Sequence, residues 1–391
     1  MPAFSIRVVG LLLLTSLLSG ATDWNRIRGV NYIPSYARNL YGAWRDYNHD
    51  AFDAELALAS DAGFNSVRIW LNYFAYAENP ARFLSNVSDA MAISRKHNLR
   101  VLPVLFDSCG VRPRPNSRLV TVSDAYRAFV NDPRFPQSWK DRSRSFYKLY
   151  AEGPGRSVLI PVGDGTPPEI ILWQHWQPSP GYDKMGSAWW PQLAEYATAV
   201  TGRLGQDENI LAWDLMNEPE FAAEDPFEHG LNDPTVQKLV EGFLRSMRQA
   251  IKAKTPHALT TVGFAALENS MRYEEFADVL TYHIYGDPEK IRLSVDKASA
   301  FSKKLGKPIF ITETLANFTF PPYDIGYLAT DHGQLEHYQK VLPALLKSNI
   351  GWMGWGLVVG RLFDSYIDIF YANGHPRPAG AYLREMLRKQ Q

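Results

Sequence analysis

The sequence has very little cysteine and no excess of charge of either sign. Cys109 is the one cysteine in 391 residues, and 41 Lys plus Arg balance 41 Asp plus Glu. A single thiol cannot form an internal disulfide, so stability must come from a buried core. Zero net charge gives no overall field to attract nucleic acid or anionic lipid. We therefore expect no nucleic-acid partner, and we interpret Cys109, just past an apolar run, as a buried thiol.

Long hydrophobic runs are also scarce. The one marked run, Val8 to Leu18, follows Arg7 and precedes small residues that end at Ala21. It is about half of the roughly 20 residues that span a bilayer. This pattern is typical of a cleaved signal peptide. We expect residues 1–21 to be that signal, and the mature chain to be secreted or periplasmic without stable membrane insertion.

Several common motifs are missing as well. The chain contains no G-x-G-x-x-G or phosphate-binding loop, no G-x-S-x-G, no H-E-x-x-H and no Cys/His cluster. These absences argue against a nucleotide site, a nucleophile-elbow esterase and a zinc site. No cofactor and no metal are therefore expected.

Eight short apolar stretches recur along the chain. Most lack the alternation of a half-exposed strand, and such near-continuous apolar runs fit parallel strands covered on both faces. The stretches are 27–33, 64–71, 100–106, 210–217, 258–264, 279–285, 308–314 and 350–358.

Helical periodicity fills the intervals between these strands. One helix is predicted between Asp50 and Gly63, which would act as a left-handed cap, and another begins at Pro80. Further helices are predicted near 188–204, 234–254, 289–305, 333–347 and 377–389, with a weak one after the fifth strand. Eight strand–helix units predict a (β/α)8 TIM barrel over residues 22–391, with a doubly wound sheet as the alternative.

One connection is much too long for a barrel. About eighty residues, 108–187, follow the third strand where a few would suffice. Many apolar and aromatic residues, Trp139, Trp173 and Trp176 among them, argue against disorder. We expect an inserted subdomain over the top of the barrel. It would either close one end of a cleft or extend an open groove, and the sequence leaves both open.

Two acids occupy strand ends in this prediction. Glu218 follows the apolar run of "LAWDLMNEPE", and Glu313 lies in "IFITETL". In a TIM barrel the ends of all strands meet at one rim, so the two carboxylates should face one cleft. A protonated and an ionised carboxyl are what glycosidic bond cleavage requires. A strand-end acid can also be a helix cap, but polar residues at most of the predicted strand ends favour a joint site.

These motifs resemble a known group of enzymes. "WDLMNEPE", "TYHIYGD" and "IFITETL" are similar to strand-four, strand-six and strand-seven signatures of retaining (β/α)8 glycosidases. The pattern is most similar to glycoside hydrolase family 5, the cellulase and mannanase family, whose strand-two Arg and strand-eight Trp match Arg68 and Trp355. The resemblance extends over nearly the whole mature chain.

The resemblance implies a role for each matching residue. Glu218 would be the acid/base and Glu313 the nucleophile. Arg68 and Tyr285 would keep Glu313 ionised, and His283 would orient the acid/base or the sugar. Asn217 would hold the sugar 2-hydroxyl, and Trp355 would form the floor of the glycon subsite. At the end of strand three, where the family usually has His, this chain has Asp107, which can accept from sugar hydroxyls.

The resulting hypothesis is a secreted retaining β-glycosidase that hydrolyses β-linked glucan- or mannan-type glycans, with an oligo- or polysaccharide as its partner. The resemblance alone implies that the linkage is β-1,4. Two alternatives remain: a catalytically inactive carbohydrate-binding barrel, and a transglycosylase that uses the same covalent intermediate. Sugar identity, endo or exo action and oligomeric state are not readable from the sequence.

Overall fold

The structure is a computed structural model. It describes residues 22–37, 40–108, 118–121, 131, 133, 137, 159–162, 179–205, 207–222, 230–316, 331–358 and 367–390. The expected signal peptide, Cys109 and most of the 108–187 insertion lie outside the described residues, so these expectations stay predictions.

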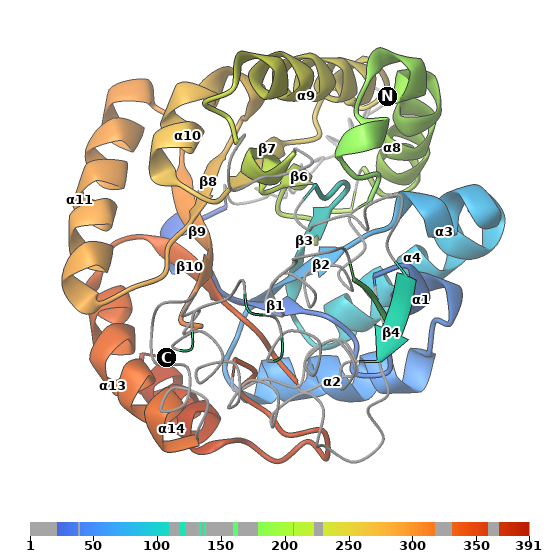
Figure 1. Ribbon diagram of the computed structural model, residues 1–391. Helices are drawn as coiled ribbons and strands as arrows, with labels where there is room; N and C mark the ends of the chain where they lie inside the picture. Colours follow the sequence, from blue (N-terminus) through green and yellow to red (C-terminus); the bar gives the residue numbers. More distant parts are fainter. Residues whose placement is uncertain are drawn as a thin grey trace, which may run out of the picture.

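Eight parallel strands close into a barrel, as the sequence predicts (Figure 1). Around the barrel the order is β1-β10-β9-β8-β7-β6-β3-β2. Each strand lies within its predicted stretch, and the near-continuous burial of their residues matches a sheet covered on both faces. The strands are β1 (Arg28–Tyr32), β2 (Ser66–Trp70), β3 (Arg100–Val104), β6 (Trp213–Asn217), β7 (Thr260–Phe264), β8 (Leu280–His283), β9 (Ile309–Thr314) and β10 (Gly351–Gly354).

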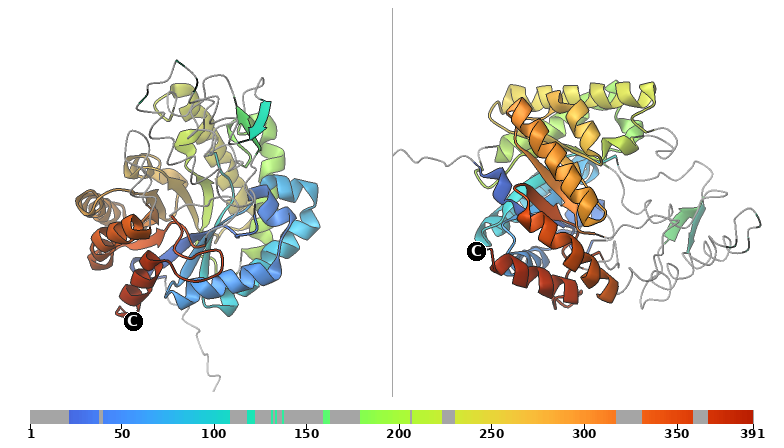
Figure 2. Two further views of the ribbon diagram at one scale, coloured as in Figure 1. Left: turned by 60° about the horizontal axis from the view of Figure 1, so that its bottom comes forward. Right: turned by 90° about the vertical axis from the view of Figure 1, so that its left-hand side faces the viewer.

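Helices lie outside this barrel, as the side views show (Figure 2). The predicted helices are all present, including the weak one, α10, while the short α1 and α3 have no counterpart in the prediction. They are α1 (Leu40–Arg45), α2 (His49–Asp61), α3 (Tyr73–Glu78), α4 (Pro80–Lys96), α8 (Trp190–Leu204), α9 (Pro234–Lys254), α10 (Leu267–Arg272), α11 (Pro288–Leu305), α13 (Asp331–Lys347) and α14 (Pro378–Arg388).

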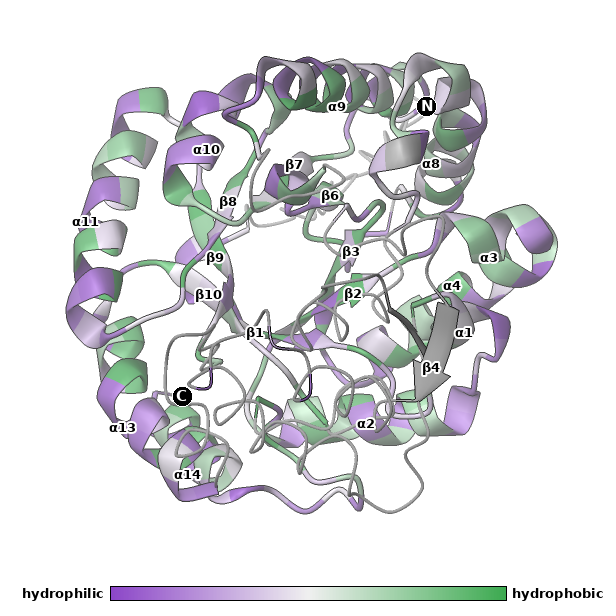
Figure 3. Cartoon of the chain, viewed as in Figure 1, coloured by the Kyte–Doolittle hydropathy of each residue, from purple (hydrophilic) through white to green (hydrophobic). Residues whose placement is uncertain are grey.

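Local signals set where these helices begin and end. The side chain of Asn48 accepts a hydrogen bond from the amide of Ala51 and caps α2. Gly63 then follows α2 with a φ of 93°, the left-handed conformation predicted for it. Hydrophobic and hydrophilic segments alternate along the outer helices (Figure 3), because one side of each helix packs on the barrel.

Only part of the insertion is described. Strands β4 (Arg118–Thr121) and β5 (Leu159–Val162) pair antiparallel. At the end of the insertion, the backbone oxygen of Ser179 accepts from the Asp107 amide at 2.6 Å, and the Ser179 hydroxyl accepts from the Tyr73 amide at 2.8 Å. The chain therefore returns to the rim of the barrel beside the end of β3.

Among the helices that the structure describes, none combines the length and apolarity that crossing a membrane would require.

Candidate active site

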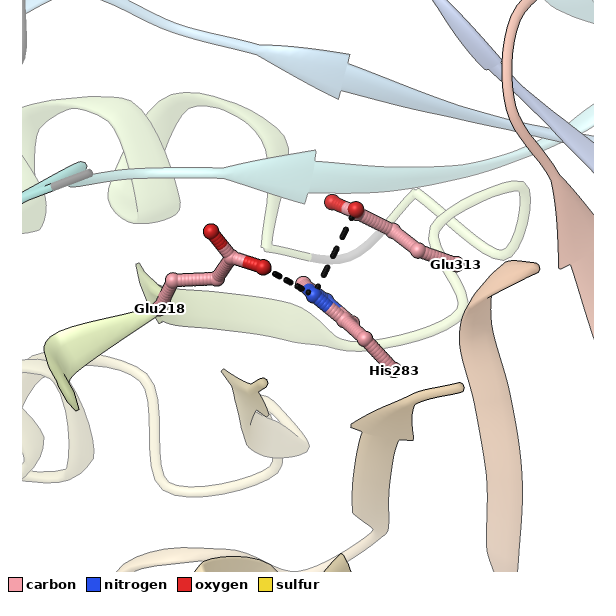
Figure 4. Close-up of side chains that lie close together, drawn as sticks. All are labelled: Glu218, His283 and Glu313. Atoms are coloured by element: carbon pink, nitrogen blue, oxygen red, sulfur yellow. Dashed lines mark hydrogen bonds and ion pairs between the residues drawn. The ribbon is translucent and has the colours of Figure 1, made fainter. Parts of the chain in front are cut away.

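Three side chains from separate strand ends meet at the rim of the barrel. Glu218 follows β6, His283 ends β8, and Glu313 lies near the end of β9. Nδ1 of His283 is 2.8 Å from a Glu218 carboxylate oxygen and 3.4 Å from one of Glu313. Figure 4 shows both carboxylates converging on the same ring nitrogen. One ring nitrogen of His283 and one carboxylate oxygen from each glutamate all lie within 4.8 Å of one another.

The backbone at Glu218 is unusual. Its φ of 45° is left-handed, which is uncommon for a residue other than glycine and recurs at functional sites. Glu218 precedes a short 3₁₀ helix, Pro219–Phe221, yet its side chain makes no capping hydrogen bond to it. Its amide donates to the backbone oxygen of Gly263 at 2.7 Å, which fixes the turn. The carboxylate is thus directed to His283 rather than to the role of a helix cap.

Glu313 is buried and held at both oxygens. Arg68 Nη1 donates to Oε1 at 2.6 Å, and the Tyr285 hydroxyl donates to Oε2 at 2.6 Å. Burial raises the pKa of the Glu313 carboxyl, while the charge of Arg68 and the hydroxyl of Tyr285 oppose this rise. These two hydrogen bonds are the ones expected of groups that keep the carboxylate charged.

Arg68 is the centre of a larger network. Its side chain is fully buried, and its five N–H groups make five hydrogen bonds, which matches its donor capacity. Nε and Nη2 both donate to Oδ2 of Asp214, at 3.1 and 2.8 Å. The remaining bonds run to Asn31 Oδ1 at 3.2 Å, Glu313 Oε1 at 2.6 Å and Asn217 Oδ1 at 2.8 Å.

Two backbone features make room for this network. A Cβ on Gly263 would lie 2.6 Å from Arg68 Nη2 and 2.9 Å from Asp214 Oδ2, so glycine is required there. The pairing of β6 with β7 shifts register between Asp214 and Asn217. Strand residues three apart normally face opposite sides of a sheet, and such an irregularity lets both reach the same guanidinium.

His283 is buried among these charges. Burial lowers the pKa of its imidazole to about 4, so the ring is uncharged at neutral pH. Its Nδ1 faces both glutamates, whereas the buried Nε2 has no hydrogen-bond partner. A neutral ring with Nδ1 at 2.8 Å from Glu218 can orient that carboxyl without adding a fixed positive charge.

Asn217 is held at both ends of its amide. Its oxygen accepts from Arg68, and Nδ2 donates to Asp107 Oδ1 at 3.4 Å. Asp107 is buried just after β3, where its carboxylate accepts from Asn217 and its amide donates to Ser179. The direct sugar contact expected of Asp107 stays a prediction; in the structure its carboxylate accepts from the Asn217 amide and fixes the direction of that group.

Trp355 lies at the end of β10 in a small apolar cluster of its own. Its ring meets that of Trp70 edge to face, with centroids 5.1 Å apart. The cluster also includes Leu40, Val104 and Ala316, and Tyr285 packs against it. The Arg68 guanidinium lies 4.5 Å from the centroid of Trp70. The aromatic residues therefore adjoin the charged network directly.

The comparison with known proteins gives matches in structure only. No protein-family model matches the sequence, and no curated protein matches it. The exo-β-1,4-mannosidase Op5Man5 from Opitutaceae bacterium strain TAV5 superposes with a TM-score of 0.56 at 17% identity over 93% of this chain and 59% of that one. A variant of GH5_18 from Streptomyces cattleya, in complex with Manβ1-4GlcNAc, gives 0.60 at 16% identity over 93% and 81%.

A third similar structure is β-glucuronidase 2 from Bacteroides uniformis, covalently bound to cyclophellitol-6-carboxylate aziridine. Its TM-score is 0.56 at 10% identity, over 93% of this chain and 35% of that one. The chain has the fold of these glycosidases. It spans 59% of the length of the mannosidase and 35% of that of the glucuronidase.

Within this glycosidase fold, the structure brings together all the site residues predicted from sequence. Arg68, Asn217, Glu218, His283, Tyr285 and Glu313 form one hydrogen-bonded group, with Asp107 at one edge and Trp355 in the adjoining cluster. The sequence-based reasoning missed Asp214 and Gly263. A signal for Asp214 exists: an acid in the middle of an apolar strand requires a buried partner.

Glu220, which has no predicted role, lies on the short helix after Glu218. Its Oε1 accepts from Asn269 Nδ2 at 2.9 Å and from the Ala266 amide at 3.3 Å. Burial raises the pKa of Glu220 to about 7. These contacts tie the Pro219–Phe221 helix to the start of α10, and so support the turn that carries Glu218.

Glu218, His283 and Glu313 also form a group that could hold a metal ion, the one such group within the described part of the chain. The hydrogen bonds among them, with Arg68 and Tyr285, account for their proximity without an ion.

Proposed function

We propose that this protein is a retaining β-glycosidase that hydrolyses β-1,4-linked glucan- or mannan-type glycans by double displacement. The proposal rests on the closeness of Glu218 and Glu313, which present oxygens within 4.8 Å of each other. Retaining glycosidases hold their two carboxyl groups about 5–5.5 Å apart, whereas inverting enzymes need about 6.5–9.5 Å to admit a water. The 4.8 Å limit is between one oxygen of each group and not between the whole carboxyl groups, and two carboxylates that both reach one imidazole nitrogen, at 2.8 and 3.4 Å, support the shorter, retaining arrangement.

Each step then has a residue to perform it. Glu313 attacks the anomeric carbon as Glu218 gives its proton to the departing glycosidic oxygen, and a glycosyl ester forms on Glu313. Water next attacks the same carbon and loses a proton to Glu218, which releases the sugar and restores both groups. Arg68 and Tyr285 stabilise the Glu313 carboxylate, and His283 orients the Glu218 carboxyl.

Among the residues that the structure describes, the network favours a neutral sugar as substrate. All five N–H groups of Arg68 are engaged by protein oxygens, so none remains for the carboxylate of a uronic acid. The names of two similar structures, an exo-β-1,4-mannosidase and a complex with Manβ1-4GlcNAc, point to β-mannosides as the first substrates to test.

The experiment is a comparison of aryl β-mannoside, β-glucoside and β-glucuronide hydrolysis by the purified protein, followed by chain-length analysis of products from β-1,4-glycans. We expect turnover of a neutral glycoside and none of the glucuronide. Binding of glycans without turnover of any glycoside would instead support an inactive carbohydrate-binding barrel. Dominant transfer to added sugar acceptors would support a transglycosylase.

We also propose that the protein acts outside the cytoplasm. This rests on the signal-like segment 1–21 alone. Expression of the full chain followed by N-terminal sequencing of the exported protein tests it: a start near Thr22 is expected, and retention of residues 1–21 on a cytoplasmic protein would overturn it.

A further inference from the structure

We infer that Asp214 is a positioning residue for the nucleophile, acting through Arg68. This inference rests on the proposed function, since it assigns a part to Asp214 in the same reaction. Asp214 lies inside β6, completely buried, and does not touch Glu313 in any described contact. Its effect on Glu313 must therefore pass through the guanidinium that the two carboxylates share.

The geometry of Asp214 explains how Arg68 is aimed. Oδ2 accepts from both Nε and Nη2 of Arg68, while Oδ1 accepts from the amide of Gly263 at 3.0 Å. Two bonds to one side of a planar guanidinium fix its plane and rotation. With that edge fixed, Nη1 points to Oε1 of Glu313 and the second hydrogen of Nη2 to Asn217.

The charges give Asp214 a second effect. Arg68 lies between two buried carboxylates, at 2.8 Å from Asp214 and 2.6 Å from Glu313. Its positive charge is shared by the two carboxylates. Arg68 therefore offsets the negative charge of Glu313 less than it would if Glu313 were its only partner. A nucleophile held too strongly by a cation is a weaker base and a poorer attacking group. Asp214 therefore moderates the Arg68–Glu313 pair as well as orienting it.

A purely structural role for Asp214 predicts something different. A buried ion pair can contribute to stability alone, and its loss would then lower the melting temperature and leave the chemistry of surviving enzyme unchanged. The positioning role and the structural role predict different values of kcat and a different pH dependence of kcat/KM for an Asp214 variant. Both quantities report on Glu313 and not on the amount of folded protein.

The pH dependence follows from the groups around Glu313. Arg68 on β2 contacts it directly, as do His283 and Tyr285 at the end of β8. The charge of Glu218, in the turn after β6, also acts on it, and Asp214 on β6 acts on it by way of Arg68. Removal of the Asp214 charge alone leaves Arg68 to act on Glu313 undivided. The pKa of Glu313 then falls, and the acid limb of the kcat/KM profile moves to lower pH.

The test compares Asp214→Asn, which keeps the shape and removes the charge, with Asp214→Glu, which keeps the charge and displaces it. For Asp214→Asn we expect kcat to fall about 100-fold, the size of effect that a small misplacement of reacting groups can have, with KM within about twofold. Its acid limb should move to lower pH. For Asp214→Glu we expect a lower kcat with the acid limb at its wild-type position.

Glu55→Gln is the matched control. Glu55 is a buried carboxylate on α2 that accepts from the Tyr32 hydroxyl at 2.7 Å, away from the network. It should lose stability with an unchanged kcat and pH profile. Wild-type kcat and acid limb in Asp214→Asn would overturn the inference; if that variant does not fold, a wild-type kcat in Asp214→Glu would overturn it.

One measurement separates failure of this inference from failure of the proposed function. A ¹³C-NMR titration of the Glu313 carboxyl needs no turnover, and it should give a lower pKa in Asp214→Asn than in the wild type. An equal pKa contradicts the inference even in an active enzyme. A wild type that is inactive on every glycoside contradicts the proposed function, whatever the titration shows.

Discussion

Arg68 and Glu313 form an ion pair across the interior of the barrel, with Nη1 and Oε1 2.6 Å apart. Their strands, β2 and β9, are not neighbours, since β1 and β10 lie between them in the barrel order. Neither side chain is exposed by more than 6%. Removal of Arg68 would leave Glu313 and Asp214 as buried carboxylates without their cation, a loss much larger than that of a surface pair. The pair therefore ties the position of the proposed nucleophile to the closure of the barrel.

Replacement of Glu313 by Gly should abolish glycoside hydrolysis. Removal of a nucleophile that acts together with its partners typically costs about 10⁴-fold or more in kcat. Added azide should occupy the vacated space and attack the anomeric carbon directly. It should restore turnover of an activated aryl β-glycoside and give an α-glycosyl azide, detectable by NMR. Recovery of activity with a β-product, or wild-type activity without azide, would contradict the assignment.

Glu218→Gln removes the proposed proton donor and base and keeps the shape of the side chain. Loss of a general acid–base group is expected to lower kcat by about 10²–10⁴-fold and to remove the basic limb of the pH profile. Initial rates across pH on an aryl β-glycoside measure both effects. The account fails if hydrolysis stays intact.

Gly263→Ala tests the close approach of the backbone to Arg68. The new Cβ would lie 2.6 Å from Nη2, so the guanidinium must move and its bonds to Asp214 and Asn217 must weaken. We expect a loss of about 10-fold or more in kcat, consistent with the sensitivity of such sites to displacement.

Gly202→Ala in α8 is the matched control for this change. A Cβ there meets nothing within 4 Å, and alanine should stabilise the helix by about 0.5–1 kcal/mol without any change in kcat. Equal kcat values for the two alanine variants would show that the space beside Gly263 is not needed.

His283 should make the protein less stable as the pH falls. Its folded pKa, about 4, is below the usual value of 6.5, so between these pH values the unfolded chain takes up a proton that the folded one excludes. The free energy of unfolding should lose about 3 kcal/mol from this group as pH falls from about 6.5 to about 4, and nothing above that range. Urea unfolding of the wild type and of His283→Gln at several pH values in this range isolates the effect. The prediction is refuted if the free energies of unfolding of the two proteins depend on pH in the same way.

The periodicity of the sequence was enough to predict the barrel, because parallel strands buried on both faces give long apolar runs that contrast with the helices. Glu218 and Glu313 were identifiable for a related reason. A single acid at the end of an apolar run can be a helix cap, but polar residues at most of the strand ends of one barrel indicate a joint site at its rim.

Other parts of the site required three-dimensional structure. The register shift in β6 directs both Asp214 and Asn217 to Arg68, and a strict two-residue period would separate them. The bond between Asp107 and Asn217 joins the ends of β3 and β6, which are adjacent in space but separated by the whole insertion. A hydrogen bond between residues on either side of a long insertion leaves no pattern in the local sequence.

The most direct test of the central claim is to trap the covalent intermediate. A 2-deoxy-2-fluoro-β-glycosyl fluoride slows both steps but slows release more, so the glycosyl-enzyme accumulates and peptide mass spectrometry can locate it. The account predicts one sugar per chain, attached to the peptide that contains Glu313, with activity lost in proportion. An adduct on another residue would contradict it. So would the absence of any adduct together with hydrolysis that inverts the configuration at the anomeric carbon.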